Sequence, residues 1–293
     1  MTMPNFFVIG AGKAGTTSLH RYLDQHPDVY MSPVKEPTFF APEAGRPHPG
    51  EPAKAAVDTR TEYEALFDGV RGERAIGESS VAYLPFAHVA APAIRDAVPD
   101  ARLIAVLRHP AERAFSDYSM YVQMGTEELD FATAVTSELE GGVEVSWWRR
   151  YVQFGHYGSF LTAWLDHFED DRLRVHLYED LVTDPVGVTR DVFGFVEVDP
   201  SFAPQTGVRH NVTRHPPKRG WVHRVLRFGP AKVAVKRVLP EHRWKPAVEW
   251  VRRKNSVVPE FPPEVRARLI DVYRDDIAVT QEILGRDLSA WLT

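Results

Sequence analysis

Short apolar runs alternate along the chain with longer stretches in which apolar residues recur at helical spacing. The short runs are rich in Val, Ile and Phe and predict five strands, at residues 5–9, 28–31, 74–77, 102–107 and 172–177. The longer stretches predict helices at residues 16–25, 111–123, 160–168, 185–195 and 263–284. The first and fourth strands hold continuous apolar runs, which is typical of strands covered on both faces. The alternation predicts a doubly wound α/β domain, with a parallel sheet of about five strands and helices on both faces.

The length of 293 residues allows one large domain or two smaller ones. Segments 42–52 and 215–218 are rich in Pro and are interpreted as surface loops, and no internal repeat is visible. Because a helical pattern resumes at 263–284, we treat residues 1–293 as a single domain. It would consist of a core at about 5–200 and of a basic loop with a C-terminal helical extension at about 205–293.

Composition narrows the class of protein. With 44% apolar and 26% charged residues, the chain is typical of globular proteins and not of disordered, collagen-like or coiled-coil ones. The absence of Cys excludes disulfides, a Cys nucleophile and a thiolate metal site. The first basic residue is Lys13, and no run of about 18 apolar residues occurs. We therefore expect neither a signal peptide nor a transmembrane segment, and a location in the cytoplasm.

The net charge of −5 hides an uneven distribution. Residues 205–254 hold fourteen Lys and Arg against two Glu. Such a block favours an anionic partner, such as a nucleotide phosphate, an acidic glycan, a membrane or a nucleic acid. A solvated basic face explains it equally well.

The strongest local signal is a glycine-rich turn between the first predicted strand and the first predicted helix. Its glycines, Gly10, Gly12 and Gly15, allow the backbone to approach a ligand closely. The free N–H groups and the dipole at the start of a helix favour an oxyanion. Lys13 adds a positive charge, and the helix opens with the hydroxyl residues Thr16, Thr17 and Ser18. The turn is therefore predicted to hold an anion.

Two other nucleotide-binding interpretations fit less well. A Walker A loop places Lys directly after its last Gly, whereas Thr16 follows Gly15 here. The fourth strand also ends in Arg108 where an ATPase or kinase usually has a carboxylate for Mg²⁺. The glycines match the G-x-G-x-x-G fingerprint of NAD(P) oxidoreductases, but Ser32-Pro33 follow the second strand where an acidic residue would bind the ribose. A nucleotide kinase and an NAD(P) oxidoreductase stay as alternatives.

Four segments together resemble the sulfotransferases that use 3′-phosphoadenosine 5′-phosphosulfate (PAPS). They are Lys13-Ala14-Gly15-Thr16-Thr17-Ser18, Val34-Lys35-Glu36-Pro37-Thr38-Phe39-Phe40, the stretch LIAVLRHPAERAFSDY within 102–118, and Leu177-Tyr178-Glu179-Asp180-Leu181 with Asp184-Pro185. The second is similar to a motif of the branch that includes the heparan sulfate sulfotransferases. The resemblance spans roughly residues 5–200 and implies a P-loop-like, three-layer fold.

The resemblance implies how the nucleotide is bound. Residues 13–18 match the family's 5′-phosphosulfate loop, so Lys13, Ala14, Gly15, Thr16, Thr17 and Ser18 would hold that end of PAPS. Lys13 would also meet the charge that develops on the departing phosphate. Arg108 and Ser116 match the 3′-phosphate motif, and a guanidinium suits a terminal phosphate. Tyr178 would stack on adenine, although a Tyr at the end of a buried strand is equally often a core residue.

The resemblance also implies a general base, Glu36, which would take the proton of an acceptor hydroxyl. A histidine, as in the cytosolic small-molecule branch, is the rival, and His109 adjoins Arg108. In Glu78-Ser79-Ser80-Val81-Ala82-Tyr83, Ser79 stands where the heparan branch usually has Lys. This departure speaks against an acidic polysaccharide as acceptor.

Family members close a basic loop over the nucleotide, and residues 209–220 offer the best match. Lys218 and Arg219 are the residues that we favour for this role. The segment 221–238 is cationic with apolar residues at helical spacing, which fits a helix packed on the domain, an acceptor lid or a membrane-surface helix.

The sequence thus predicts a sulfotransferase that moves a sulfuryl group from PAPS to an acceptor and releases adenosine 3′,5′-bisphosphate (PAP). A hydroxyl is the acceptor group that we favour, with an amine as the second choice. We expect no metal, because His residues are scattered and PAPS arrives activated. A small molecule, a lipid or a glycan is expected as acceptor, and no nucleic acid. A non-catalytic module that binds nucleotides or polyanions is the alternative from another class. The identity of the acceptor and the oligomeric state are left open.

Overall fold

Five parallel strands form the centre of the computed structural model, which describes residues 2–42, 57–124, 126–141, 149–207 and 260–293. The strands are β1 (Phe6–Gly10), β2 (Val29–Met31), β3 (Ala75–Ser79), β4 (Arg102–Leu107) and β5 (Leu173–Leu177). Their order across the sheet is β2-β3-β1-β4-β5, and every pairing is parallel. The predicted α/β class, the parallel sheet and all five strands are confirmed, with ends that differ from the predicted ones by at most two residues.

The burial of the strands follows their places in the sheet. Every residue of β1 is buried, and only Arg102 of β4 is partly exposed. Both strands lie inside the sheet, as their continuous apolar runs indicated. By contrast, most residues of the edge strand β5 are partly or fully exposed. The long apolar strands therefore mark the centre of the molecule, where the two loops of the candidate site begin.

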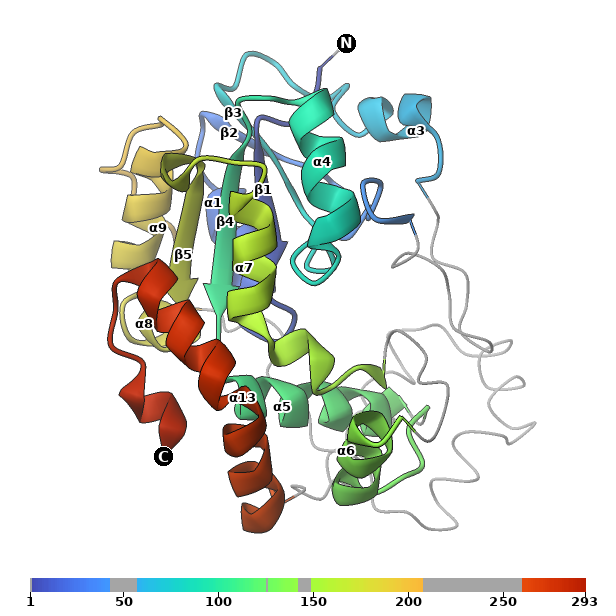
Figure 1. Ribbon diagram of the computed structural model, residues 1–293. Helices are drawn as coiled ribbons and strands as arrows, with labels where there is room; N and C mark the ends of the chain where they lie inside the picture. The colour runs from blue at the N-terminus through green and yellow to red at the C-terminus, as the bar shows by residue number, and fades with distance from the viewer. Residues whose placement is uncertain (1, 43–56, 125, 142–148, 208–259) are drawn as a thin grey trace, which may run out of the picture.

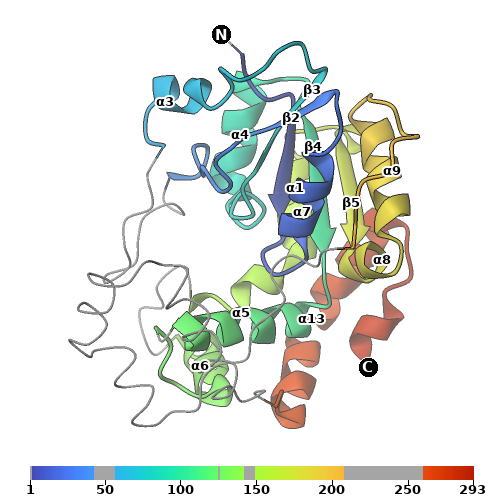
Figure 2. The same cartoon turned by 180° about the vertical axis from the view of Figure 1, so that it is seen from behind.

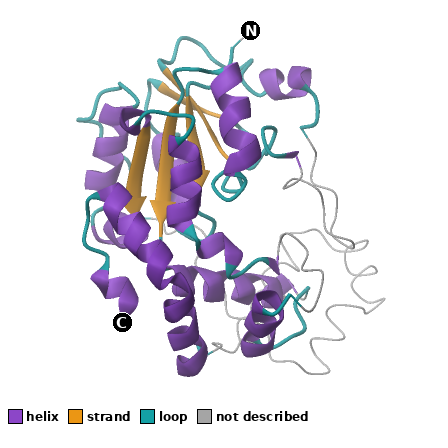
Figure 3. Ribbon diagram, viewed as in Figure 1, coloured by secondary structure: helices purple, strands orange, loops and turns teal. Residues whose placement is uncertain are grey.

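Helices cover both faces of the sheet, which gives three layers (Figures 1 and 3). On one face, α4 (Ala87–Ala97) packs against α7 (Tyr157–Leu165). On the other, seen from behind in Figure 2, α1 (Thr16–Leu23) packs against α9 (Pro185–Phe195). The helix predicted at 160–168 begins and ends three residues earlier, whereas α9 has the predicted bounds. The doubly wound arrangement is confirmed.

A group of helices lies beyond the carboxyl ends of the strands (Figure 1). It comprises α5 (Pro110–Met124), α6 (Phe131–Leu139) and α13 (Pro263–Leu284), and α13 contacts α5, α6 and α7. The ring of Phe115 on α5 stacks on Phe261, with 4.6 Å between centroids. The C-terminal helical extension predicted at 263–284 is therefore present and packs on the core.

Hydrogen bonds from two residues of α13 fix it to the start of α7 and to the segment before α7. The Asp276 carboxylate of α13 accepts hydrogen bonds from the backbone N–H groups of Gly158, at 2.8 Å, and Ser159, at 3.0 Å. These N–H groups belong to the first turn of α7, where no intrahelical partner exists. The hydroxyl of Tyr273 also donates to the Val152 carbonyl at 2.9 Å. The C-terminal helix thus supplies the cap of a helix that precedes it by more than a hundred residues.

Several short elements complete the described chain. They are α3 (Arg60–Ala65), α8 (Tyr178–Thr183) and the 3-10 turns η2 (Gln153–Gly155), η3 (Asp170–Arg172) and η4 (Ser289–Leu292). Within the described ranges, no helix has the length and apolar character that a bilayer span requires.

Candidate active site

The candidate site lies where β1 and β4, neighbours in the sheet, reach their carboxyl ends. This is the switch point of the topology, because the chain leaves β1 toward β2 on one side and later returns to β4 on the other. Ligands of open α/β sheets bind at such points. Lys13 follows β1 and Arg108 follows β4, and the Arg108 Nη1 donates to the Lys13 carbonyl oxygen at 3.4 Å. The two residues expected to bind opposite ends of one nucleotide therefore lie together.

The glycine-rich turn has the backbone shape that its sequence predicts. Lys13 adopts φ 69 and Gly15 φ 86, both in the left-handed region. A Cβ at Gly15 would lie 3.0 Å from Leu181 Cδ2 and 3.2 Å from Tyr178 Cδ2, so both conformation and space require glycine here. Gly15 precedes α1, whose first N–H groups have no intrahelical partner and carry the positive end of the helix dipole.

Side chains of the turn divide between the core and the site. Ala14 and Thr16 are buried, whereas Thr17 and Ser18 are partly exposed at the start of α1. An anion would therefore approach the backbone at 14–16 and the partly exposed side chains of Thr17 and Ser18. A buried Thr16 side chain packs in the interior, so its part in binding an anion falls to its N–H group.

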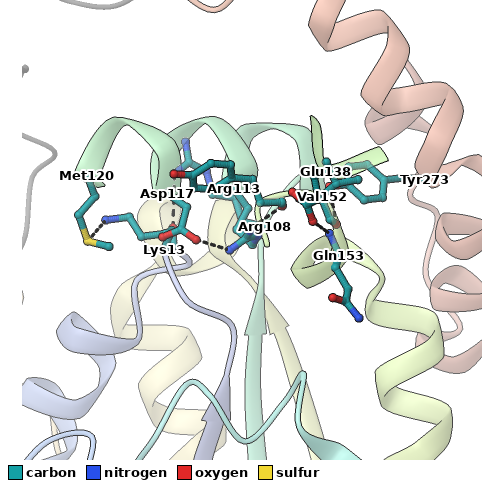
Figure 4. Close-up of polar contacts among 10 residues, drawn as sticks. Lys13, Arg108, Arg113, Asp117, Met120, Glu138, Val152, Gln153 and Tyr273 are labelled. Atoms are coloured by element: carbon teal, nitrogen blue, oxygen red, sulfur yellow. Dashed lines mark hydrogen bonds and ion pairs between the residues drawn. The ribbon is translucent and has the colours of Figure 1, made fainter. Parts of the chain in front are cut away.

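Lys13 is poorly solvated. Its Nζ lies 3.5 Å from the Met120 Sδ of α5, as Figure 4 shows. Burial lowers the Lys13 pKa, the charge of Asp117 raises it, and Arg108 and Arg113 lower it further. Asp117 is itself bound to the buried Arg113 at 3.2 Å. A partly desolvated ammonium beside two guanidinium groups favours the arrival of an anion.

Arg108 is held between an aromatic ring and a carboxylate. Its guanidinium carbon lies 4.9 Å from the centroid of the Tyr178 ring, and its Nη2 lies 4.0 Å from Glu112 Oε2. Tyr178 is the first residue of α8 and directly follows β5, which ends at Leu177 as predicted. Its ring contacts both Gly15 and Arg108, which places it over the site. Ser116 is buried on α5, without a hydrogen bond to Lys13 or Arg108.

Glu36 lies on the loop that follows β2, residues 32–41, which we call the base loop. Its backbone has φ 63, and its N–H donates to the Ser79 carbonyl at 2.9 Å. Its Oε2 accepts a hydrogen bond from the Val81 N–H at 2.8 Å, while Oε1 pairs with Lys35. The side chain keeps 19% of its surface exposed. Glu36 is thus an oriented carboxylate with access to solvent.

Residues 79–83, which begin with the last residue of β3, connect the base loop to the glycine-rich turn. Thr38 N–H donates to the Ser80 Oγ at 3.1 Å, and Phe40 N–H donates to the Tyr83 hydroxyl at 3.3 Å. Toward the glycine-rich turn, the Val81 Cγ2 lies 3.6 Å from the point that a Cβ would occupy if Gly12 were another residue. Val81 therefore touches the turn with its side chain and holds Glu36 with its backbone. Motif analysis had no signal for Val81, because its role is carried by its backbone N–H.

A buried pair, His20 and Ser79, was also missed. Ser79 Oγ lies 2.9 Å from His20 Nδ1, and both residues are buried. Burial, with smaller contributions from the positive charges of Lys35 and Arg21, lowers the His20 pKa to about 4. The imidazole is therefore neutral near pH 7. The position at which the heparan branch usually has Lys is occupied here by an uncharged pair that joins α1 to β3.

His109, the rival base, is engaged on another side. Its Nδ1 accepts a hydrogen bond from the Ala111 N–H at 3.2 Å, and its Nε2 lies 3.3 Å from the Arg266 Nη2. Burial, with the charge of Arg266, lowers its pKa to about 4. Its ring also faces Trp291, at 6.2 Å between centroids. These contacts tie His109 to the C-terminal helices, whereas Glu36 is held by Val81, whose side chain lies beside the glycine-rich turn.

Some sequence predictions fall outside the described residues. Lys218, Arg219 and the segment 221–238 are among them, and so are all fourteen cations of the basic block. Their proposed contacts with a nucleotide, an acceptor or a membrane stay predictions.

Comparison with known proteins gives a consistent result. The model of the Sulfotransferase family matches residues 4–203. Mouse heparan sulfate glucosamine 3-O-sulfotransferase 3B1 is 31% identical over 196 residues, which cover 66% of this chain and 46% of that protein. Human carbohydrate sulfotransferase 15 is 26% identical over 253 residues, covering 68% of this chain and 44% of that protein. The chain thus spans less than half the length of these curated relatives.

A solved structure matches along the whole chain. The crystal structure of a sulfotransferase from Alicyclobacillus acidocaldarius superposes with a TM-score of 0.75, at 32% identity and with 100% of both chains covered. Together, these similarities favour sulfuryl transfer over the kinase and NAD(P) oxidoreductase alternatives. Because the family model covers more than half of the sequence and the glycine-rich turn, Glu36 and Arg108 all fall within it, the chain belongs to the Sulfotransferase family.

Proposed function

We propose that this protein is a PAPS-dependent sulfotransferase that moves a sulfuryl group to an acceptor hydroxyl and releases PAP. The observation that carries the proposal is the hydrogen bond between Arg108 and the Lys13 carbonyl, which joins the turn after β1 to the end of β4. An NTPase would need a carboxylate for Mg²⁺ at the end of a strand. Here the strand beside the turn ends at Leu107 and is followed by an arginine.

The residues present fit a nucleotide with phosphates at two ends. The glycine-rich turn and the start of α1 offer N–H groups and hydroxyls to the 5′ end. The guanidinium of Arg108 suits a 3′-phosphate, and the ring of Tyr178 between Gly15 and Arg108 suits the base or ribose that separates the two ends. Lys218 and Arg219 are proposed to close over the nucleotide. The activated sulfuryl group itself is the chemistry that PAPS supplies when bound.

The proton and the leaving charge are handled by two different side chains. Lys13 Nζ donates a hydrogen bond to the oxygen between sulfur and the departing 5′-phosphate, where negative charge grows as that bond breaks. Glu36 accepts the proton of the acceptor hydroxyl as its oxygen bonds to sulfur. The Val81 N–H holds Glu36 Oε2, so Oε1 is the oxygen that can take the proton once Lys35 shifts from it. We propose that the reaction needs no metal.

The acceptor is proposed to be a hydroxyl of a small molecule, a lipid or a glycan. The curated relatives named above include a heparan sulfate glucosamine 3-O-sulfotransferase and a carbohydrate sulfotransferase. The buried pair of Ser79 with a neutral His20 supplies no positive charge beside the base loop, which supports a less acidic acceptor. We further propose that residues 1–293 form one domain and that the protein works in the cytoplasm.

The test combines binding with transfer. The full chain is titrated with PAP, with ATP and Mg²⁺, and with NADPH while its thermal unfolding is followed. We expect stabilisation by PAP alone, and transfer of labelled sulfate from PAPS when acceptor extracts are supplied. Stabilisation by ATP with Mg²⁺ or by NADPH in place of PAP would reject the proposal. Binding of PAP without transfer to any acceptor would instead identify a non-catalytic module.

A further inference from the structure

Glu78 is a buried carboxyl group that the proposed reaction does not use. It lies on β3 opposite Phe7 of β1 and has no exposed surface. Both of its oxygens are buried, and neither has a hydrogen-bond partner among the residues that the structure describes. An isolated carboxylate in such a place is costly, so the group must find a partner or stay uncharged. The surroundings of Glu78 decide between these outcomes.

Aromatic rings form these surroundings. Phe40 of the base loop packs edge-on against Phe7, Tyr63 and Tyr83, with centroid distances of 5.9, 5.3 and 6.1 Å. Tyr63 comes from α3, and its hydroxyl is also buried without a partner in the described chain. The cluster therefore contains an unpaired hydroxyl and an unpaired carboxyl group. A protonated carboxyl group can donate to a tyrosine hydroxyl, and a carboxylate can accept from one, so this contact fits either state. The complete burial of Glu78 among rings is what favours the uncharged form.

Electrostatics agree with this geometry. Burial raises the Glu78 pKa from its ordinary 4.5 to about 8. The hydroxyls of Tyr83, Tyr63 and Ser80 lower the pKa by less than burial raises it, and the negative charge of Glu36 raises it further. These groups come from α3, from the segment after β3 and from the base loop, and none of them is a cation that would hold a carboxylate.

The same residues position Glu36. Ser80 and Tyr83, which face Glu78, accept the backbone hydrogen bonds of Thr38 and Phe40 in the base loop. Glu36 and Thr38 both have left-handed backbone conformations, so the loop depends on these contacts for its shape. A charge on Glu78 would therefore act on the loop through its anchors as well as through repulsion of Glu36.

We propose that Glu78 is a positioning residue that works as an uncharged carboxylic acid, keeping the base loop attached to β3 and a second negative charge away from Glu36. In this proposal, the protonated Glu78 carboxyl group donates its hydrogen bond to the hydroxyl of Tyr63. The inference depends on the proposed function only for the catalytic role of Glu36.

The primary test is the pH dependence of stability, which requires neither PAPS nor acceptor. Glu78→Gln keeps the shape and removes titration. Because the folded-state pKa is raised, folded wild type carries one more proton than the unfolded chain between about pH 4.5 and 8. The wild-type unfolding constant should therefore rise with pH by up to about tenfold per unit relative to that of Glu78→Gln. Denaturant unfolding at several pH values measures this ratio.

A constant ratio between pH 5 and 8 would overturn the proposal, and so would failure of Glu78→Gln to fold, since a neutral isostere should suit the site. Turnover supplies the second readout. We expect Glu78→Gln to keep at least about half of wild-type kcat at pH 7 and to lose less activity than wild type above pH 8, whereas Glu78→Ala should lose most of it. A Glu78→Gln variant that is stable but as inactive as Glu36→Gln would show that the charge is needed and the proposal wrong. If no transfer is found for wild type, the stability test still decides on Glu78.

Discussion

The two halves of the candidate site are built in different ways. On the nucleotide side, the glycine-rich turn and Arg108 offer cations and backbone N–H groups at the ends of β1 and β4. On the base side, Glu36 is held by contacts to residues 79–83, more than forty positions along the chain. The anion-binding turn of the first half is specified by a short segment of sequence. The base loop of the second half takes its shape only after β2 and β3 have paired. Anion binding can thus be encoded locally, but an oriented base requires the tertiary structure.

The halves also differ in charge. Lys13, Arg108 and Arg113 make the nucleotide side positive. The base side holds the carboxylate of Glu36, which Lys35 pairs with, beside a neutral His20 and the Glu78 that we propose to be uncharged. Substitutions should therefore separate the halves: changes on the nucleotide side should weaken PAP binding, and changes on the base side should lower turnover while PAP binding stays the same.

The largest effect is expected for Glu36→Gln. Loss of a general base lowers kcat by about 10²- to 10⁴-fold. Gln can still accept the hydrogen bond from the Val81 N–H, so the base loop should keep its shape and PAP affinity should stay within about twofold. Turnover with labelled PAPS and calorimetry with PAP measure the two quantities. Glu197→Gln, on a side chain that is 63% exposed, is the matched control. A large loss of PAP affinity in Glu36→Gln would remove Glu36 as the base.

Lys13→Ala should follow, with kcat lowered by about 10²- to 10³-fold, because it deletes the donor to the departing phosphate. PAP should also bind more weakly, since the same ammonium meets the 5′-phosphate. Lys35→Ala is the control across the two halves, because Lys35 pairs with Glu36 and not with the turn. Its PAP affinity should equal that of wild type. Near-normal turnover of Lys13→Ala would refute the assigned site.

Arg108→Ala should weaken PAP by about 10- to 100-fold, the loss expected for charge-assisted hydrogen bonds. Adenosine 5′-monophosphate lacks the 3′-phosphate, so its affinity should change much less. Calorimetry with both nucleotides gives the ratio, and Arg274→Ala, at a side chain that is 53% exposed, serves as control. Equal losses for the two nucleotides would show that Arg108 does not bind the 3′-phosphate.

The smallest effect is expected for Gly15→Ala. An L-residue in the left-handed conformation costs about 1–2 kcal/mol, and the new Cβ would press on Leu181 and Tyr178. Gly285, at the end of α13, is also left-handed, with φ 58, but has open space around its Cβ position, so Gly285→Ala tests backbone strain alone. Urea unfolding should show the greater loss of stability at Gly15. Equal losses of stability at the two positions would mean that the contacts of the new Cβ with Leu181 and Tyr178 do not contribute to the effect.

Much of the fold was predictable because its strands carry their own signal. The apolar runs of β1 and β4 follow from burial on both faces, and α9 and α13 have the predicted bounds. The helix α4 was missed, since its Ala-rich sequence contains Pro92, a residue that usually ends or bends a helix. For α3 a signal existed in the capping box of Thr59 and Glu62. A search for such boxes would have found it.

The site was predictable only in part, for a related reason. Lys13 and Arg108 belong to motifs whose residues are close in sequence, and their proximity follows from the order of the strands. The motifs gave His20 no role, and Glu78 entered only as the neighbour of Ser79, because the roles of both depend on burial and on partners from distant segments. Glu36 was found by resemblance, and its orientation by Val81 became visible only in the structure.

The cap that Asp276 places on α7 has a practical consequence for anyone who would trim this chain. The match to the family model ends at residue 203, which invites a shorter protein that stops there. Such a fragment would lack Tyr273 and Asp276, leaving one of the two helices on that side of the sheet with bare amide groups at its start. Residues 1–203 therefore lack contacts on which α7 depends, and we expect a protein that stops there to be less stable than the full chain.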